Sequence, residues 1–306
     1  MNRRAFSLSV LGLLCSSVAV RAGEAIFLNF DQDALDAAYD QAPWAPNAKE
    51  VIGRYSSVSA EVRQKYPPKT EKYGPRDAET LDIFAPAGAE KLPVMVFVHG
   101  GTWRLLSSAE AAHPAPTFVE NGCIYVALNF DNIPAVRLPD MADQCRRAVA
   151  WVAKNIAKHG GDPDRIFVSG HSSGGHLAGV LVTTDWTAFD VPADVVKGGV
   201  VMSGMYDLYP VMLSSRREYL KLSSGETAAM SPMRHLDQVA SDIVVVYGSN
   251  ESPEFKRQSI EFATALEGMG RLKAKFELTA NHFEVPEALN SPDSDLSKFV
   301  LKMMLG

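Results

Sequence analysis

A serine flanked by glycines is the residue of this sequence best placed to act as a nucleophile. Residues 170–174 read Gly-His-Ser-Ser-Gly, so Ser172 has a glycine two positions to either side. An apolar run at residues 165–169 precedes this pattern, and a run compatible with a helix follows it. A serine in such a strand–turn–helix unit is held in a sharp turn, beside helix N–H groups that favour developing negative charge. We therefore predict that Ser172 attacks a carbonyl carbon.

A second glycine-rich turn is suited to stabilising the oxyanion that this attack creates. Residues 99–103 read His-Gly-Gly-Thr-Trp and directly follow an apolar run at residues 93–98. Because glycine has no Cβ atom, it lets backbone N–H groups come close to a reacting oxygen. We predict that the donors are the N–H groups of Gly101, Thr102 and Ser173.

A nucleophilic serine also needs a general base within reach. Enzymes that use a G-x-S-x-G serine present the acid and then the histidine after it in the chain. Three histidines follow the serine, namely His176, His235 and His282. His176 lies on the nucleophile's own helix and should pack beneath the turn, whereas His282 lies in a polar loop after the last expected strand. We predict His282 as the base, with a pKa within about one unit of the ordinary 6.5, and keep His235 as the alternative.

The base in turn needs an acid that fixes its tautomer and stabilises the imidazolium. Glu251 follows an apolar run at residues 243–247 and precedes a helix that begins with proline. We predict Glu251 as this acid. Two alternatives stay open: Asp207 ends the preceding strand, and Glu254 falls in the first turn of the next helix, where the helix dipole alone would favour a carboxylate.

Aromatic side chains beside these motifs are candidates for a substrate pocket. Trp103, Tyr206 and Phe283 each adjoin one of the segments above, and each is equally compatible with a place in the core. The sequence predicts no metal site and no cofactor, because it lacks H-E-x-x-H, paired-cysteine and strand-linked G-x-G-x-x-G patterns. The predicted chemistry therefore depends on side chains and backbone groups alone.

The candidate residues fall at the ends of strands in a chain that alternates strands with helices. We expect strands at residues 79–84 (of edge type), 93–98, 123–128, 165–169, 198–202, 242–247 and 273–278. We expect helices at residues 31–39, 141–157, 173–182, 253–269 and 296–304. Between the first of these helices and about residue 74 we expect a polar, proline-rich loop. This alternation predicts an α/β fold, a mostly parallel sheet with helices on both faces. Ligands bind such sheets at the carboxyl ends of the strands.

The composition is that of a globular protein and argues against two classes of partner. The 306 residues are 46% hydrophobic and carry a formal net charge of −6, with lysine and arginine scattered along the chain. We expect no nucleic-acid partner, because phosphate binding requires a basic patch. We expect no stable membrane insertion either, because the uncharged run at residues 5–20 is shorter than the roughly 20 residues of a spanning helix.

The first 22 residues are predicted to be a secretory signal peptide. Arg3 and Arg4 precede the uncharged run, and Ala22 supplies the small residue at which a signal peptidase cleaves. The arginine pair also resembles a twin-arginine signal. We therefore expect export to the periplasm, with the cytoplasm as the alternative location, and a mature chain of residues 23–306 that forms a single domain.

Taken together, the motifs resemble the kynurenine formamidase-like (arylformamidase-like) and small carboxylesterase branch of the α/β-hydrolases. The resemblance is carried by residues 35–39, 99–103, 160–165, 170–177, 251–255 and 281–283 and covers most of the chain after Asp31. It implies the α/β-hydrolase fold and a cofactor-free hydrolase of aryl formamides or small esters, with the acid at the position of Glu251. The family usually has aspartate there, and glutamate supplies the same group one methylene farther out.

Three functional hypotheses follow. The first is an esterase or amidase that cleaves a small-molecule ester or amide through an acyl-enzyme on Ser172, with His282 protonating the leaving group. The second is an arylformamidase that hydrolyses N-formylkynurenine. The third is a non-catalytic binding module of the same fold, which would not need the full set of catalytic residues that this sequence contains.

Overall fold

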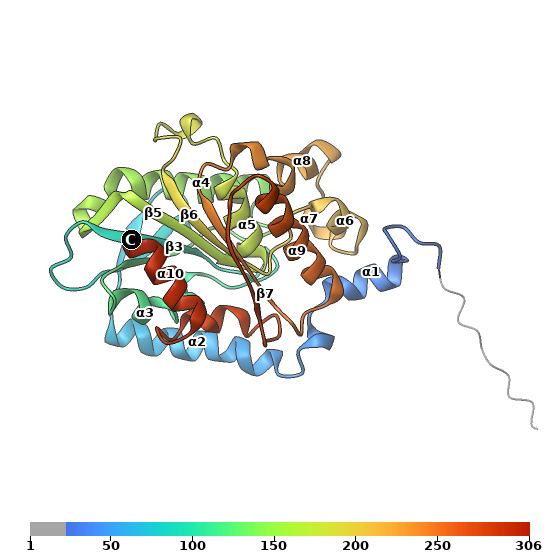
Figure 1. Ribbon diagram of the computed structural model, residues 1–306, viewed down its shortest axis with the longest axis horizontal. Coiled ribbons are helices and arrows are strands. Elements are labelled where there is room, and N and C mark those ends of the chain that lie inside the picture. The colour runs from blue at the N-terminus through green and yellow to red at the C-terminus, as the bar shows by residue number, and fades with distance from the viewer. Residues whose placement is uncertain (1–22) are drawn as a thin grey trace, which may run out of the picture.

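One sheet of eight strands runs through residues 23–306, the part of the chain that the computed structural model describes (Figure 1). The strands are β1 (Lys69–Lys72), β2 (Thr80–Phe84), β3 (Leu92–Val98), β4 (Ile124–Leu128), β5 (Gly161–His171), β6 (Val196–Met202), β7 (Asp242–Gly248) and β8 (Leu272–Leu278). Their order across the sheet is β1-β2-β4-β3-β5-β6-β7-β8. β2 pairs antiparallel with β1 and β4, and the remaining neighbours pair parallel. The predicted mostly parallel α/β sheet is therefore confirmed.

Helices cover both faces of this sheet (Figure 1). The α-helices of the described residues are α1 (Gln32–Tyr39), α2 (Ala48–Lys65), α3 (Ala115–Val119), α4 (Leu138–Asn155), α5 (Ser173–Val182), α6 (Leu208–Leu213), α7 (Arg217–Leu220), α8 (Ser224–Ala229), α9 (Pro253–Gly268) and α10 (Asp295–Leu305). Apolar side chains of α4, α5 and α9 share one core cluster with the sheet, and those of α2, α3 and α10 share the other. The sheet is thus the middle of three layers.

The central strands contain continuous apolar runs because both of their faces are covered. In β3, Val94, Val96 and Val98 belong to the core beneath α4 and α5, whereas Met95 and Phe97 belong to the opposite core. Such two-sided burial replaces the apolar–polar alternation of a half-exposed strand. This burial on both faces explains why the continuous apolar runs of the sequence predicted the positions of these strands correctly.

The loop expected up to residue 74 is wrong, because this segment contains α2 and β1. α2 is 18 residues long but buries only Val51, Tyr55, Ser59 and Val62. This narrow stripe, which includes a serine, gives a weak helical pattern. β1 has the polar sequence Lys-Thr-Glu-Lys and lies at the edge of the sheet, so β2 is not the edge strand that its alternation indicated.

The candidate residues gather because their loops leave the carboxyl ends of parallel strands. The glycine turn follows β3, the nucleophile follows β5, Glu251 follows β7 and His282 follows β8. β3, β5, β6, β7 and β8 run in the same direction, so these ends lie along one edge of the sheet. The fold therefore brings distant segments to one site.

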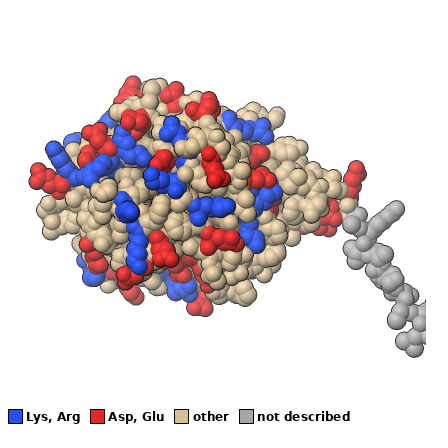
Figure 2. Space-filling model, viewed as in Figure 1, with Lys and Arg blue, Asp and Glu red and all other residues tan. Residues whose placement is uncertain are grey.

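Neither the surface charge nor the cysteines of the described residues point to a further site. On the face that Figure 2 shows, acidic and basic side chains lie among one another. Cys123 and Cys145 are both buried, and neither forms a disulfide within residues 23–306. No helix between residues 23 and 306 has the length and apolar character needed to cross a bilayer. The predicted signal peptide, residues 1–22, lies outside the described residues.

Candidate active site

The turn between β5 and α5 holds Ser172 in a strained conformation. Its φ and ψ are 59° and −123°, a region that residues other than glycine rarely adopt. The flanking glycines make the turn possible, because a Cβ at Gly170 would come within 2.2 Å of the carbonyl oxygen of Gly174, and a Cβ at Gly174 within 2.1 Å of that of Val98. The turn therefore projects Ser172 Oγ at the N-terminal end of α5.

A continuous chain of hydrogen bonds links the serine to a histidine and a glutamate. Ser172 Oγ donates to His282 Nε2 over 2.8 Å, and His282 Nδ1 donates to Glu251 Oε1 over 2.9 Å. The carboxylate thereby fixes the tautomer in which Nε2 is free to accept the serine proton. The structure thus brings the predicted nucleophile, base and acid into the mutual geometry of a Ser-His-acid triad.

Burial shapes the acid–base properties of this triad. Glu251 and His282 are 0% and 3% exposed. Burial lowers the pKa of His282 to about 3, and the charge of Arg216 acts in the same direction. Burial raises the pKa of Glu251 to about 7. The pKa of His282 therefore lies below the value near 6.5 that the sequence led us to expect, because a dry site disfavours the charged form of both groups.

Two of the alternative residues lie away from the triad. His235 Nε2 makes a hydrogen bond with the carbonyl oxygen of Ala228 over 3.1 Å and is not hydrogen-bonded to the serine. Asp207 caps α6, where its Oδ1 accepts from the N–H of Tyr209 over 3.0 Å. Both residues therefore have structural partners of their own.

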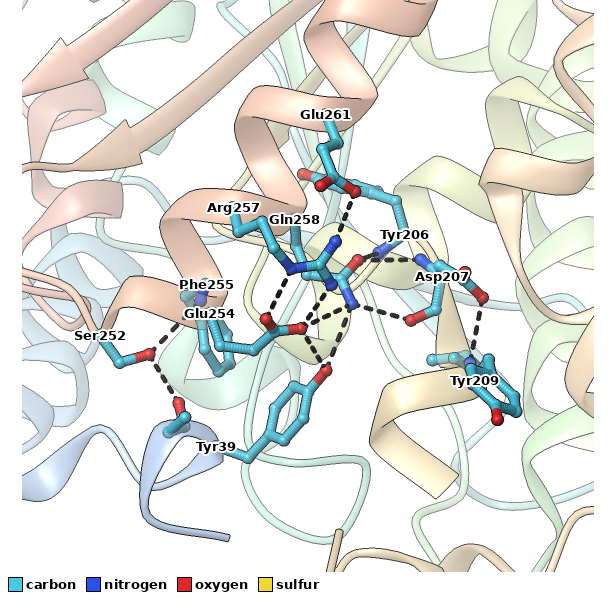
Figure 3. A network of polar contacts seen from close by, with 12 residues as sticks. Tyr39, Tyr206, Asp207, Tyr209, Ser252, Glu254, Phe255, Arg257, Gln258 and Glu261 are labelled. Atoms are coloured by element: carbon cyan, nitrogen blue, oxygen red, sulfur yellow. Dashed lines mark hydrogen bonds and ion pairs between the residues drawn. The ribbon is translucent and has the colours of Figure 1, made fainter. Parts of the chain in front are cut away.

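The third alternative, Glu254, belongs to a buried network that fastens α1 to α9 (Figure 3). Its Oε1 accepts from the hydroxyl of Tyr39 and from Arg257 Nη2, each over 2.7 Å. Gln258 Nε2, one turn farther along α9, donates to the carbonyl oxygen of Asp207 over 2.8 Å. Glu254 thus has partners within this network, and Glu251 is the carboxylate that is hydrogen-bonded to His282.

The glycine turn after β3 lies against the nucleophile. A Cβ at Gly100 would be 3.2 Å from the Cβ of Ser172. Gly101 and Thr102 have φ angles of 109° and 55°, which turn the chain sharply. Within residues 23–306, the N–H groups of Gly101, Thr102 and Ser173 have no hydrogen-bond acceptor. All three predicted donors are therefore free to bind an oxyanion, and their assignment to an oxyanion hole stays a prediction.

Ser172 and His282 open onto a cavity of about 210 Å³. Its walls are mostly apolar and come from α2, the turn after β3, the segment before α7 and the loop after β8. The lining residues include Gln41, Ile52, Tyr55, Phe97, Gly101, Thr102, Leu105, Leu106, His113, Arg216, Phe283 and Pro286. A small, largely apolar ligand fits such a space.

One of the three predicted pocket aromatics lines the cavity, and two do not. Phe283 is in the wall. Trp103 is 1% exposed, and its Nε1 donates to Nδ1 of His176 over 3.2 Å, beneath the turn where that histidine was expected. Tyr206 stacks on Phe262 with ring centroids 4.2 Å apart. Both are therefore core residues, because their polar atoms find partners inside the protein.

The sequence interpretation missed most of the wall, including Tyr55, His113 and Arg216. Tyr55 stacks on His113, with ring centroids 5.0 Å apart and an interplanar angle of 12°. Arg216 enters the cavity from the segment before α7. Tyr55 belongs to the unpredicted α2 and Arg216 to the unpredicted stretch of short helices, so neither adjoined a recognisable motif.

Comparisons with known proteins find relatives of this chain among named hydrolases. The BD-FAE family model matches residues 81–209. "Kynurenine formamidase" of Danio rerio is 32% identical over 90% of this chain and 97% of its own length. "Esterase LipQ" of Mycobacterium tuberculosis is 30% identical over 72% of this chain and 56% of its own length.

Solved structures resemble the fold over most of the chain. A thioesterase candidate from Silicibacter sp. has a TM-score of 0.77 at 25% identity and covers 89% of this chain and 99% of its own. An esterase from Pyrobaculum calidifontis has a TM-score of 0.62 at 19% identity, with coverage of 84% and 95%, and supports the fold alone. With these likenesses and its 32% identity to a relative that it spans almost completely, the chain belongs to the kynurenine formamidase family of the α/β-hydrolases.

Proposed function

We propose that the protein is a serine hydrolase that cleaves small carboxylic esters or amides through an acyl-enzyme on Ser172. The observation that carries this proposal is the hydrogen-bonded chain from Ser172 through His282 to Glu251, which opens onto a small apolar cavity. The non-catalytic alternative is disfavoured, because a binding module has no need of an intact and strained nucleophile turn.

In the first half of the reaction, the serine becomes acylated. His282 Nε2 takes the hydroxyl proton while Ser172 Oγ attacks the substrate carbonyl carbon, and Glu251 stabilises the imidazolium that forms. The N–H groups of Gly101, Thr102 and Ser173 would receive the oxyanion. When the tetrahedral intermediate collapses, the imidazolium gives its proton to the departing alcohol or amine, and the acyl group stays on Ser172.

In the second half, water repeats the sequence. His282 takes a proton from the water as its oxygen attacks the acyl carbon, and the same N–H groups receive the second oxyanion. Collapse of this intermediate returns the proton to Ser172 Oγ and releases the carboxylic acid. Every group that moves a proton belongs to this chain.

A fluorophosphonate probe tests the assignment of Ser172. We expect the probe to label the protein and p-nitrophenyl acetate to be hydrolysed, because the serine is activated by a neighbouring base. Ser172→Ala should abolish labelling and lower kcat by at least about 10⁴-fold. Ser173→Ala is the matched control and should still be labelled. Labelling that persists in Ser172→Ala would place the nucleophile elsewhere.

Arylformamidase activity on N-formylkynurenine is the second candidate. Two observations favour it: the relatives named kynurenine formamidase match over nine-tenths of the chain, and Tyr55 and Phe283 supply aromatic walls to the cavity. The values of kcat/KM for N-formylkynurenine and p-nitrophenyl acetate separate the two candidates. A formamidase should prefer the first substrate, whereas a general esterase should prefer the second.

We also propose that the protein is exported. The arginine pair at residues 3 and 4, the uncharged run and Ala22 support this proposal. Export would bring the hydrolase to esters or amides outside the cytoplasm.

A further inference from the structure

One cationic side chain lies in the wall of the cavity. Among the described residues that line it, Arg216 is the only lysine or arginine. It is half-buried and stands immediately before α7, in the stretch of short helices between β6 and β7. The remaining walls are mostly aliphatic and aromatic. A full positive charge in such surroundings needs an explanation, because burial of a charge without an ionic partner costs free energy.

The guanidinium is held in place by neutral groups. Arg216 Nη2 donates to the carbonyl oxygen of Tyr39 over 2.6 Å, and Nη1 donates to the hydroxyl of Tyr219 over 3.3 Å. Its central carbon lies 5.8 Å from the ring centroid of Tyr39 and 5.9 Å from that of Trp103. These contacts orient the planar group without neutralising it.

No carboxylate between residues 23 and 306 lies within 4.0 Å of this guanidinium. The two acidic residues of the cavity wall have other partners. Asp40 accepts from the N–H of Ala42 over 3.0 Å, and Glu110 accepts from the N–H of Ser107 over 2.9 Å. The positive charge of Arg216 therefore acts on the site, and it is one reason why the pKa of His282 is low.

We propose that Arg216 is a specificity-determining residue that binds a carboxylate carried by the substrate. A guanidinium that is fixed in place, has N–H groups to spare and lacks an ionic partner matches the bidentate geometry of a carboxylate. The apolar walls would hold the body of the same molecule. The substrate class is thus small esters or amides with an apolar body and an anionic end, a refinement that rests on the proposed hydrolase function.

Two pairs of esters, in each of which one member carries a carboxylate and the other does not, test this proposal. On the acyl side, 4-nitrophenyl butyrate and mono-4-nitrophenyl succinate have the same leaving group and chains of similar length. On the leaving-group side, phenyl acetate and 4-acetoxybenzoate form the corresponding pair. Comparing each variant with the wild-type protein on the same ester cancels the intrinsic reactivity of that ester.

Arg216→Met removes the charge while keeping an apolar side chain. We expect it to lower kcat/KM for the anionic ester of at least one pair by about 10- to 100-fold, the value of a charged hydrogen-bonding pair. The loss on the neutral ester of that pair should be much smaller, so that the preference for the anionic ester falls by about tenfold or more. Arg216→Lys should recover only part of the loss, because an ammonium lacks the planar fork.

Arg217→Met is the matched control. Arg217 is the next residue, is exposed and does not line the cavity, so its loss should alter neither ester. Equal losses on both members of each pair in Arg216→Met, or no loss on either anionic ester, would overturn the proposal. If the wild-type protein neither hydrolysed the neutral esters nor reacted with a fluorophosphonate, the hydrolase function itself would fail instead.

Discussion

At the scale of single residues, the protonation state of Glu251 decides which way the imidazole faces. A carboxylate accepts from His282 Nδ1 and leaves Nε2 open to the serine. A protonated carboxyl can instead donate to Nδ1, which moves the ring proton to Nε2 and turns the base into a donor. Because burial raises the pKa of Glu251 to about 7 and lowers that of His282 to about 3, the carboxyl takes up its proton first.

The pH dependence of the rate should therefore report the glutamate. The active form carries an unprotonated Glu251, so kcat/KM for a neutral ester should fall as the pH drops through about 7. An isolated histidine with the low pKa of His282 would still be neutral there. A profile of kcat/KM between about pH 5 and pH 9 measures this limb.

Two variants identify the group responsible. Glu251→Gln keeps the side-chain volume but cannot titrate, so its rate should fall by up to about 10⁴-fold and become nearly independent of pH around 7. Asp207→Asn, which alters the cap of α6 and an ion pair with Arg234 away from the triad, should retain both the rate and the limb. A limb that survives in Glu251→Gln would mean that the histidine titrates it after all.

At the scale of elements, the close approach of β5, α5 and the turn after β3 couples stability to catalysis. Gly174→Ala would place a Cβ 2.1 Å from the carbonyl oxygen of Val98 and 2.4 Å from that of His99. The backbone must move to relieve this, which should lower the free energy of unfolding by about 1–3 kcal/mol. The movement also displaces the predicted oxyanion donors, so kcat should fall together with stability.

A glycine elsewhere supplies the control. Gly53 lies within α2, and a Cβ there would have nothing within 4 Å. Gly53→Ala should raise the free energy of unfolding by about 0.5–1 kcal/mol, because alanine favours the helix, and leave kcat unchanged. Denaturant unfolding and ester hydrolysis measure both variants. A stable and active Gly174→Ala protein would contradict the tight packing of the turn.

The same elements show what a sequence can and cannot predict. The buried strands could be predicted from continuous apolar runs, and β8 from its alternation of apolar and polar residues. The triad candidates could be predicted because each of them follows one of these strands. α2 was not, because only one residue per turn is buried and one of these is Ser59. α7 is four residues long, too short for any period to emerge. The pocket wall was therefore largely invisible, since Tyr55 and Arg216 belong to these two regions.

At the scale of the whole molecule, the proposed export makes a prediction about the mature chain. Cleavage after Ala22 would remove Arg3, Arg4 and Arg21. We expect cell fractionation and N-terminal sequencing to find a chain that begins near Gly23 outside the cytoplasm. A replacement of both Arg3 and Arg4 by lysine should block export only if the twin-arginine route is used. Full-length protein confined to the cytosol would contradict the proposal.

The place of His282 after β8 has a consequence for the time at which the enzyme becomes active. Ser172 and its turn are translated well before β8, the edge strand that, among the described residues, pairs with β7 alone. A nascent chain can thus contain the nucleophile, the glycine turn and Glu251 while it still lacks a base. On the proposed mechanism, hydrolysis begins only after β8 has been added to the sheet, so the enzyme becomes active when the sheet is complete.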